Sequence, residues 1–351
     1  RASAIRLLSW ISHNMKKVTF KEISKIVGVS PMHVSRALAG HPYVKEELRR
    51  RIFKVAKQLN YSVNPFGRGL SKNIQMKARI ICLLTKYDNF FQTEYFINLT
   101  DAISNSARSK GYDIIIVSLG DDEAGNIKRL KNLINYYEAG IIEGFVFIAP
   151  AMGAKEGLFL HGEKVNLVCV GGKLEADTKY VDVDNFEAGY EAAAYLAELG
   201  HRRIAFVGGF EDRYDTQDRR HGFVNCLRMK GIEQDPGLML DGNYDKAGGK
   251  KATAELFSNG RSADAVFYTN DLMAFGGMEY FRENGIAVPR DVSIVGFDDL
   301  VASASAEPPL TTSRQPYEEM GKAAVESLLQ KGTVSRKIPA RMIIRKSCAK
   351  R

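Results

Sequence analysis

Several patterns that would indicate particular protein classes are missing from this sequence of 351 residues. Its four cysteines (Cys82, Cys169, Cys226 and Cys348) lie far apart and form no CxxC pair, so a disulfide framework or a zinc finger is not expected. Its six histidines show no metal-ligand spacing, and we therefore expect neither a metal nor a cofactor. No apolar run approaches the roughly 18 residues of a membrane span, which argues against a membrane protein.

The motifs of common enzyme classes are also absent. The sequence has no GxxxxGK[ST] phosphate loop, no GxSxG nucleophile motif and no HExxH zinc motif. The pair Gly208-Gly209 lacks the rest of a phosphate-binding loop. The sequence therefore predicts a binding protein and not an enzyme.

Charge is distributed unevenly along the chain. Residues 1–77 carry 16 lysines and arginines against 3 acidic residues, whereas the remaining 274 residues carry 34 against 38. A short basic segment on a mildly acidic body indicates a nucleic-acid-binding module joined to another domain, although a solvated basic surface would give the same pattern. Met15 resembles a natural start, so we expect residues 1–14 to be a non-native or disordered extension.

The basic segment predicts three short helices. A capping box at residues 19–22 begins the first helix. Ser30 as N-cap and Pro31 at the first helical position begin the second, and a third covers residues 46–60. Two short helices joined by a tight turn form a helix-turn-helix, whose second helix fits the major groove of DNA. We therefore expect an all-α DNA-binding domain over residues 15–61.

The run VTFKEISKIVGVSPMHVSRAL at residues 18–38 resembles the opening of lactose-repressor (LacI/GalR) transcription factors. The similarity continues through residues 64–70 and then through the body to about residue 346. It implies a hinge at residues 62–77 that becomes helical on operator DNA. In this family a leucine, here Leu70, wedges into the minor groove at the centre of a near-palindrome and bends the duplex.

The helical pattern and the resemblance together give a set of expected DNA contacts. They are Thr19, Ser30, Pro31, Met32, His33, Ser35, Arg36, Tyr43, Lys45, Arg49, Tyr61, Asn64, Arg68 and Leu70. The chain departs from the family pattern at His33, where threonine is usual, and this leaves open whether residue 33 contacts a phosphate or a base. Gly67 and Gly69 replace better helix formers in the hinge, where glycine costs about 0.5–1 kcal/mol relative to alanine.

After the hinge, strand-like apolar runs alternate with amphipathic helical stretches. This alternation is typical of parallel sheets covered by helices on both faces, and there are too many units for one sheet. We expect an α/β body of two Rossmann-like lobes, and the resemblance implies the periplasmic-binding-protein type over residues 78–351. The first lobe is expected at about 78–178 and 311–338, and the second at about 179–310 and 339–351. The matching landmarks are VDVDN, GHRRIAFVGG, VGFDD and PPLTTSRQP.

Polar side chains follow several of the expected strands. Ligands of open α/β sheets bind at the carboxyl ends of strands, so Arg219, Asn270 and Asp298 are candidates to bind sugar hydroxyls. In the family the matching residues hold the effector, although Asn270 or Asp298 could instead cap the next helix. With no tryptophan in the body, phenylalanine and tyrosine must cover the apolar faces of a sugar. The expected effector contacts are Phe90, Phe91, Asp215, Arg219, Tyr244, Asn270, Asp298 and Gln315.

These observations predict a homodimeric regulator, in the simplest case a repressor, in the cytoplasm and associated with the nucleoid. A small molecule would control its affinity for double-stranded, near-palindromic operator DNA. A carbohydrate is the expected effector, and a purine or another metabolite is the alternative. A solute-binding protein is the alternative from another class, and the basic helix-turn-helix argues against it. The tail at residues 347–351 has no leucine heptads, so a tetramerising coiled coil there is not expected.

Overall fold

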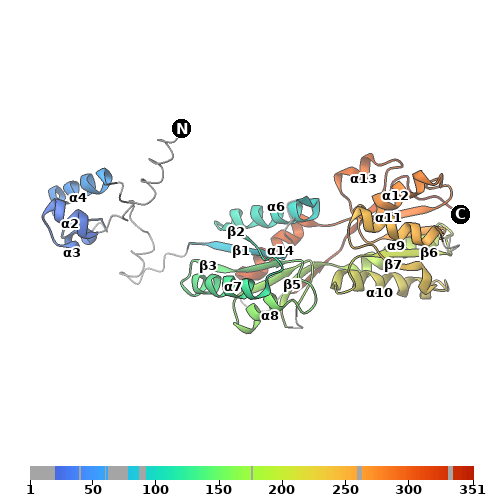
Figure 1. The fold of residues 1–351 in the computed structure, drawn as a ribbon, viewed down its shortest axis with the longest axis horizontal. Helices are drawn as coiled ribbons and strands as arrows, with labels where there is room; N and C mark the ends of the chain where they lie inside the picture. Colours follow the sequence, from blue (N-terminus) through green and yellow to red (C-terminus); the bar gives the residue numbers. More distant parts are fainter. Residues whose placement is uncertain are drawn as a thin grey trace, which may run out of the picture. The chain divides into compact units, whose positions relative to one another are not determined.

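The computed structural model divides the chain into two units, Arg1–Met76 and Lys77–Arg351 (Figure 1). It describes residues 20–38, 41–59, 61, 78–86, 92–174, 177–258, 263–330 and 335–351. Outside these residues lie the expected extension at 1–14, the hinge at 62–77 and six expected contacts: Thr19, Asn64, Arg68, Leu70, Phe90 and Phe91.

The described part of the first unit contains three helices around a small core. They are α2 (Phe20–Val27), α3 (Pro31–Leu38) and α4 (Glu46–Gln58). Ile23, Val34 and Ile52, one from each helix, are fully buried at its centre. Gly28 ends α2 with a φ of +75°, a left-handed conformation that glycine adopts without strain. The predicted helix-turn-helix is confirmed.

The described part of the second unit contains two sheets, as predicted, and each has six strands. The first has the order β11-β5-β4-β3-β1-β2 and the second has the order β12-β10-β9-β8-β6-β7. The first consists of β1 (Ile80–Thr85), β2 (Asp113–Ser118), β3 (Ile142–Ile148), β4 (Leu167–Val170), β5 (Lys179–Val183) and β11 (Arg336–Ile338). The second consists of β6 (Ile204–Gly208), β7 (Met239–Asp241), β8 (Ala265–Tyr268), β9 (Ser293–Asp298), β10 (Thr311–Arg314) and β12 (Arg341–Ile343). Neighbouring strands run parallel except β10 and β12, which are antiparallel.

Helices cover both faces of each sheet. The first sheet packs with α6 (Glu94–Ser109) and α14 (Tyr317–Leu329) on one face, and with α7 (Glu123–Glu138) and α8 (Lys155–Gly162) on the other. The second sheet packs with the pairs α9 (Asn185–Glu198)–α10 (Tyr214–Met229) and α11 (Lys246–Ser258)–α12 (Asp271–Glu283), and α13 (Val301–Ser305) follows β9.

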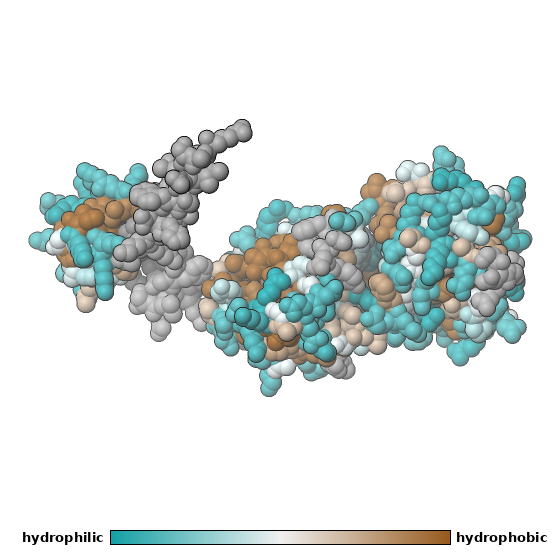
Figure 2. Space-filling view, viewed as in Figure 1, coloured by the Kyte–Doolittle hydropathy of each residue, from teal (hydrophilic) through white to brown (hydrophobic). Residues whose placement is uncertain are grey.

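Burial on both faces explains the continuous apolar strands. In β1, Ile81 and Leu83 point into one hydrophobic cluster, while Cys82 and Leu84 point into the cluster on the opposite face. A strand covered on both sides cannot alternate apolar with polar residues. At the surface, hydrophilic side chains predominate, and hydrophobic ones gather on the first lobe around β1 and β2 (Figure 2).

The lobe boundaries differ from the expected ones at two strands. β5 pairs with β4 and β11, so it belongs to the first lobe and not to the second. β10 pairs with β9 and belongs to the second lobe and not to the first. Each strand completes the sheet that the chain is about to leave, where the edge of the strand before it satisfies its backbone hydrogen-bonding groups. The crossovers therefore follow these strands.

Candidate effector cleft and DNA-binding helix

The second helix of the first unit has one apolar and one open face. Val34, Ala37 and Leu38 of α3 are buried, whereas Met32, His33 and Arg36 are exposed. Ser30 lies just before α3, where its hydroxyl oxygen accepts the backbone N–H of His33 at 3.4 Å. Side chains able to contact a base or a phosphate therefore lie on the face that leaves the core.

The other expected DNA contacts differ in their solvent exposure and in the contacts that they already make within the domain. Tyr43 is 89% exposed and Lys45 is also exposed. Arg49, however, is half-buried, and its guanidinium donates a hydrogen bond of 2.8 Å to the carbonyl oxygen of His41. Tyr61 is half-buried against Phe20, with ring centres 5.7 Å apart. Arg49 and Tyr61 thus have structural contacts that the sequence pattern did not indicate.

In the second unit, Arg219 on α10 is a buried effector candidate that contacts three other elements. It is 4% exposed. Its Nε donates to Asn185 Oδ1 at 2.9 Å, and one terminal nitrogen donates to the carbonyl oxygen of Thr269 at 2.8 Å. The guanidinium carbon lies 3.8 Å from the centre of the Phe297 ring, a distance suited to a cation–π contact. Arg219 therefore joins the carboxyl ends of β8 and β9 to α9.

Asp215 lies one turn before Arg219 on the same helix. Its carboxylate accepts a hydrogen bond of 2.6 Å from the Tyr244 hydroxyl and lies 3.3 Å from Arg213 Nε and 3.8 Å from Arg219. Burial opposes its ionisation, but the two arginines and Tyr244 outweigh burial and hold the pKa of Asp215 below its ordinary value. Two arginines thus keep a charged carboxylate inside the site.

Asn270 takes the structural role that the sequence left open. It is the N-cap of α12, where its Oδ1 accepts the backbone N–H of Met273 at 2.9 Å. Its Nδ2 donates to the Tyr244 carbonyl oxygen at 2.9 Å. An asparagine amide has two N–H donors, so one remains for a ligand. Asn270 is a helix cap that also lies beside the expected effector residues.

Asp298 and Gln315 form a second polar pair. Gln315 Nε2 donates to Asp298 Oδ1 at 2.6 Å, and both side chains are buried. Burial and then the neighbouring Asp271 raise the pKa of Asp298 well above its ordinary value. Within the described residues, Asp298 forms no ion pair, unlike Asp215. One carboxyl group of the site is therefore held charged, and the other is biased toward its protonated form.

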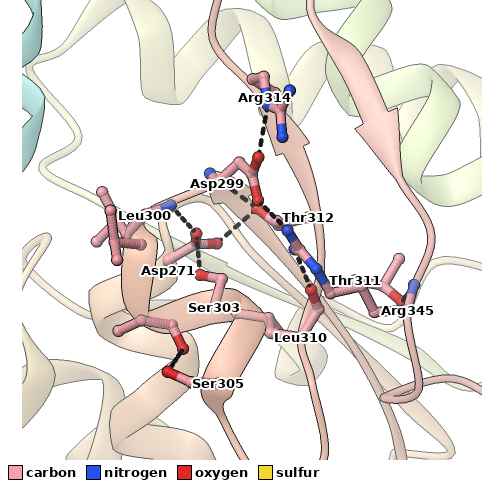
Figure 3. A network of polar contacts seen from close by, with 12 residues as sticks. Asp271, Asp299, Leu300, Ser303, Ser305, Leu310, Thr311, Thr312, Arg314 and Arg345 are labelled. Atoms are coloured by element: carbon pink, nitrogen blue, oxygen red, sulfur yellow. Dashed lines mark hydrogen bonds and ion pairs between the residues drawn. The ribbon is translucent and has the colours of Figure 1, made fainter.

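A network of polar contacts around Asp271 and Asp299 holds the turn that follows β9 (Figure 3). Asp271, fully buried, accepts hydrogen bonds from Leu300 N (2.9 Å) and from the hydroxyls of Ser303 and Thr312 (2.6 Å each). Gly296 passes so close that a Cβ there would lie 2.2 Å from Asp271 Oδ1, which explains the glycine of VGFDD.

Asp299 holds the other side of the same turn. Its carboxylate receives one hydrogen bond from Arg314 and one from Arg345, each 2.6 Å long. Asp298 and Asp299 have φ angles of +123° and +57°, which non-glycine residues adopt rarely. These contacts keep the turn in an unusual conformation and aim Asp298 at Gln315.

Arg213 is the functional candidate that the sequence reading missed. It precedes α10, is 5% exposed, and donates across the lobes to the carbonyl oxygens of Ala149 and Gly171. The only signal was an arginine six positions before Arg219 in the loop after β6. Nearby, the backbone N–H of Met152 donates to the Asp212 carbonyl oxygen at 3.0 Å, also between lobes.

A second interlobe contact joins α6 of the first lobe to α13 of the second. Glu94 of α6 accepts the backbone N–H of Val301 at 3.0 Å. A cavity of about 990 Å³ opens there, and Asp298, Gln315 and Tyr317 are among its lining residues. Among the described residues, the buried Tyr317 hydroxyl has no hydrogen-bond partner, which leaves it available to a ligand. Of the expected effector residues, Asp298 and Gln315 line this cavity, whereas Asp215, Arg219, Tyr244 and Asn270 do not. Asp215 is instead connected to the other lobe through Arg213.

Among the residues that the structure describes, no group of three or more His, Cys, Asp or Glu side chains could hold a metal ion. No helix in that part of the chain has the length and hydropathy that a membrane crossing requires.

Comparison with protein families matches both units. Residues 19–64 match bacterial regulatory proteins of the lacI family, and residues 193–348 match a periplasmic binding protein-like domain. The chain is 30% identical over 338 residues to the HTH-type transcriptional repressor CytR of Escherichia coli K12, which covers 94% of this chain and 96% of that repressor. It is 26% identical over 316 residues to the HTH-type transcriptional repressor PurR of Pasteurella multocida, covering 89% and 91%.

Solved structures show the same architecture. A complex of the transcriptional regulator CelR with cellobiose aligns with a TM-score of 0.69 at 26% identity, over 94% of this chain and 99% of that one. The lac repressor dimer bound to operator and the anti-inducer ONPF aligns with a TM-score of 0.74 at 22% identity, over 95% and 100%. With a helix-turn-helix, a two-lobed body and a relative of this identity along nearly its whole length, the chain belongs to the lacI family of bacterial regulatory proteins and is a transcriptional regulator, not an enzyme.

Proposed function

We propose that the protein is a homodimeric repressor that binds near-palindromic, double-stranded operator DNA and releases or tightens it when a carbohydrate binds between the lobes. The proposal is supported by the buried cluster of Arg219, Asp215 and Tyr244, which Arg213 connects to the other lobe. It is also supported by Asp298 and Gln315, which line a cavity that residues of both lobes surround. Carboxylates accept from sugar hydroxyls, while arginine and glutamine donate to them. The structural relative in complex with cellobiose supports a carbohydrate as the ligand class.

Aromatic side chains beside these polar groups suit the C–H faces of a sugar. Tyr244 contacts Phe210 edge to face at 5.9 Å, and Tyr95 meets Tyr317 in the same way at 6.0 Å. A purine or another nitrogen heterocycle is the second candidate. The N–H donors of Arg213 lie beside the acceptor oxygens of Asp215, which also contacts Tyr244. That pairing matches the edge of a heterocyclic base as well as a pair of sugar hydroxyls.

For the operator we propose contacts from Met32, His33, Ser35 and Arg36 of the open α3 face and from Tyr43 and Lys45. A second copy of the chain suits the first lobe, where the edge strand β2 has half-buried Ile114 and Ile116. An unpartnered edge with apolar side chains favours pairing with another chain. Because the operator is chromosomal, we assign the protein to the cytoplasm and, within it, to the nucleoid.

Two measurements test the proposal. Duplexes with a random central segment are selected on the immobilised full-length protein, and the enriched sequence is assayed by fluorescence anisotropy. We expect a near-palindrome bound by two chains, and recovery of no preferred sequence would contradict the DNA part. The protein–operator complex is then titrated with monosaccharides, disaccharides including cellobiose, nucleosides and purine bases. A response to heterocycles alone would overturn the carbohydrate assignment in favour of the second candidate.

A further inference from the structure

Ser30, just before α3, and His33, in the first turn of α3, form a side-chain pair that orients the histidine ring. Ser30 Oγ and His33 Nδ1 lie 2.9 Å apart, one helical turn from each other. The same hydroxyl oxygen accepts the backbone N–H of His33 at 3.4 Å. Both residues are exposed, on the face shared with Met32 and Arg36. The Ser30 side chain therefore contacts the His33 ring as well as its backbone.

This pairing determines which ring nitrogen can serve a ligand. The Ser30 hydroxyl has one O–H and two lone pairs, so it can donate to Nδ1 of His33 while it accepts the backbone N–H. A neutral imidazole that accepts at Nδ1 carries its proton at Nε2, and a charged imidazole also carries one there. In both of these forms the ring directs an N–H donor away from Ser30, whereas a neutral ring with its proton at Nδ1 would present an acceptor at Nε2.

We propose that His33 reads the operator by donating a hydrogen bond from Nε2 to an acceptor on the DNA, with Ser30 as the residue that orients its ring. This inference rests on the proposed operator-binding function. The acceptor is either a phosphate oxygen or the N7 of a purine, since the N-terminal residues of such a helix reach both. A site that presents only an amino donor, such as cytosine N4, would be rejected.

Three substitutions of His33 test whether its side chain donates a hydrogen bond or only makes packing contacts. In His33→Gln the amide N–H reaches about as far as Nε2, in His33→Asn it reaches only as far as Nδ1, and in His33→Ala both are lost. On the selected operator we expect Asn and Ala to weaken binding roughly fivefold to tenfold, while Gln stays within about twofold of wild type. Equal binding by Ala and wild type, or equal weakening by Gln and Ala, would overturn the proposal.

Modified duplexes identify the acceptor. Each purine near the half-site is replaced in turn by its 7-deaza analogue, and each phosphate by a methylphosphonate. At one position the modification should weaken operator binding of the wild type roughly fivefold and leave binding of His33→Ala unchanged. This position is a 7-deaza purine if the acceptor is a base, and a methylphosphonate if the acceptor is a phosphate. The absence of any such position would overturn the inference.

Ser30 is tested by a double-variant cycle. Ser30→Gly removes the hydroxyl at a position where glycine is still an acceptable N-cap. We expect it to weaken operator binding in the wild type but to add much less when His33 is already alanine, because the hydroxyl acts through the ring. Additive losses would show that Ser30 does not act through His33. A wild-type protein that selects no operator would instead refute the proposed function itself.

Discussion

Replacing Arg219 by alanine is predicted to destabilise the body strongly as well as to alter effector binding. The side chain is almost fully buried and makes charged hydrogen bonds to Asn185 and Thr269. A hydrogen bond to a charged group contributes about 1.5–3 kcal/mol, and a desolvated cation–π contact such as that with Phe297 contributes up to about 2 kcal/mol. The loss of the ion pair with Asp215 adds little, because Asp215 would keep Arg213 and Tyr244 as partners.

We therefore expect a loss of about 3–5 kcal/mol in the free energy of unfolding, because truncation would leave the buried acceptors of Asn185 and Thr269 without their donor. For a unit of this size that corresponds to a fall in the melting temperature of roughly 10 °C. Calorimetry and urea unfolding of the full chain measure it. The matched control is Arg220→Ala, since Arg220 is the next residue on α10 but is half-buried and lies 3.9 Å from the exposed Glu211.

The control should lose less than about 1 kcal/mol. A third variant, Arg219→Lys, keeps the charge but not the fork that reaches two acceptors at once. It should retain part of the stability and lose most of the effector response. If Arg219→Ala costs no more than the control, the guanidinium does not join β8, β9 and α9, and the reasoning about the site is refuted.

Three further predictions concern single residues. Arg36→Ala should cost about 1–3 kcal/mol of operator affinity in anisotropy titrations if it pairs with guanine, and an equal loss on all DNA sequences would contradict a base contact. Burial raises the pKa of Asp271 to about 6 from 3.8, so the folded state binds this proton more tightly than the unfolded chain does. The free energy of unfolding should therefore gain up to about 3 kcal/mol from this group as the pH falls from about 6 to about 4, and Asp271→Asn should remove that gain in urea titrations; parallel pH profiles of the two proteins would contradict it. Arg213→Ala should open the lobes, measured as an increased radius of gyration by small-angle scattering, and an unchanged radius would show that the carbonyls of Ala149 and Gly171 do not need it.

Local patterns in the sequence were sufficient to predict both fold classes. Helix caps such as Ser30 and Pro31 act on their own helices, and the apolar strands and amphipathic helices follow from burial on two faces. The lobe membership of β5 and β10 was predicted wrongly, although each pairs with the strand immediately before it in the sequence. Nothing within residues 179–183 indicates whether they pair with the strand before them or with one that follows.

The site was harder to predict for a related reason. Side-chain types suggested Arg219, Asp215 and Tyr244 correctly as neighbours, because carboxylates, amides and arginines at strand ends tend to converge. Arg213 escaped notice because its acceptors across the lobes are backbone carbonyls, which every residue possesses and no sequence pattern marks. The helical pattern and the resemblance predicted that Arg49 contacts DNA, and neither indicated that its guanidinium donates to the His41 carbonyl oxygen.

The interlobe contacts determine what an effector must do to change the operator affinity. A ligand shifts a conformational equilibrium only by the difference between its affinities for the two states. One that takes the Arg213 donors from Ala149 and Gly171 removes contacts that exist only when the lobes are together, and so favours the open form. One that instead joins Arg219 of the second lobe to the first lobe, and leaves Arg213 in place, adds contacts specific to the closed form. The direction of the response therefore depends on whether the effector competes with Arg213 or adds to it, and not on affinity alone.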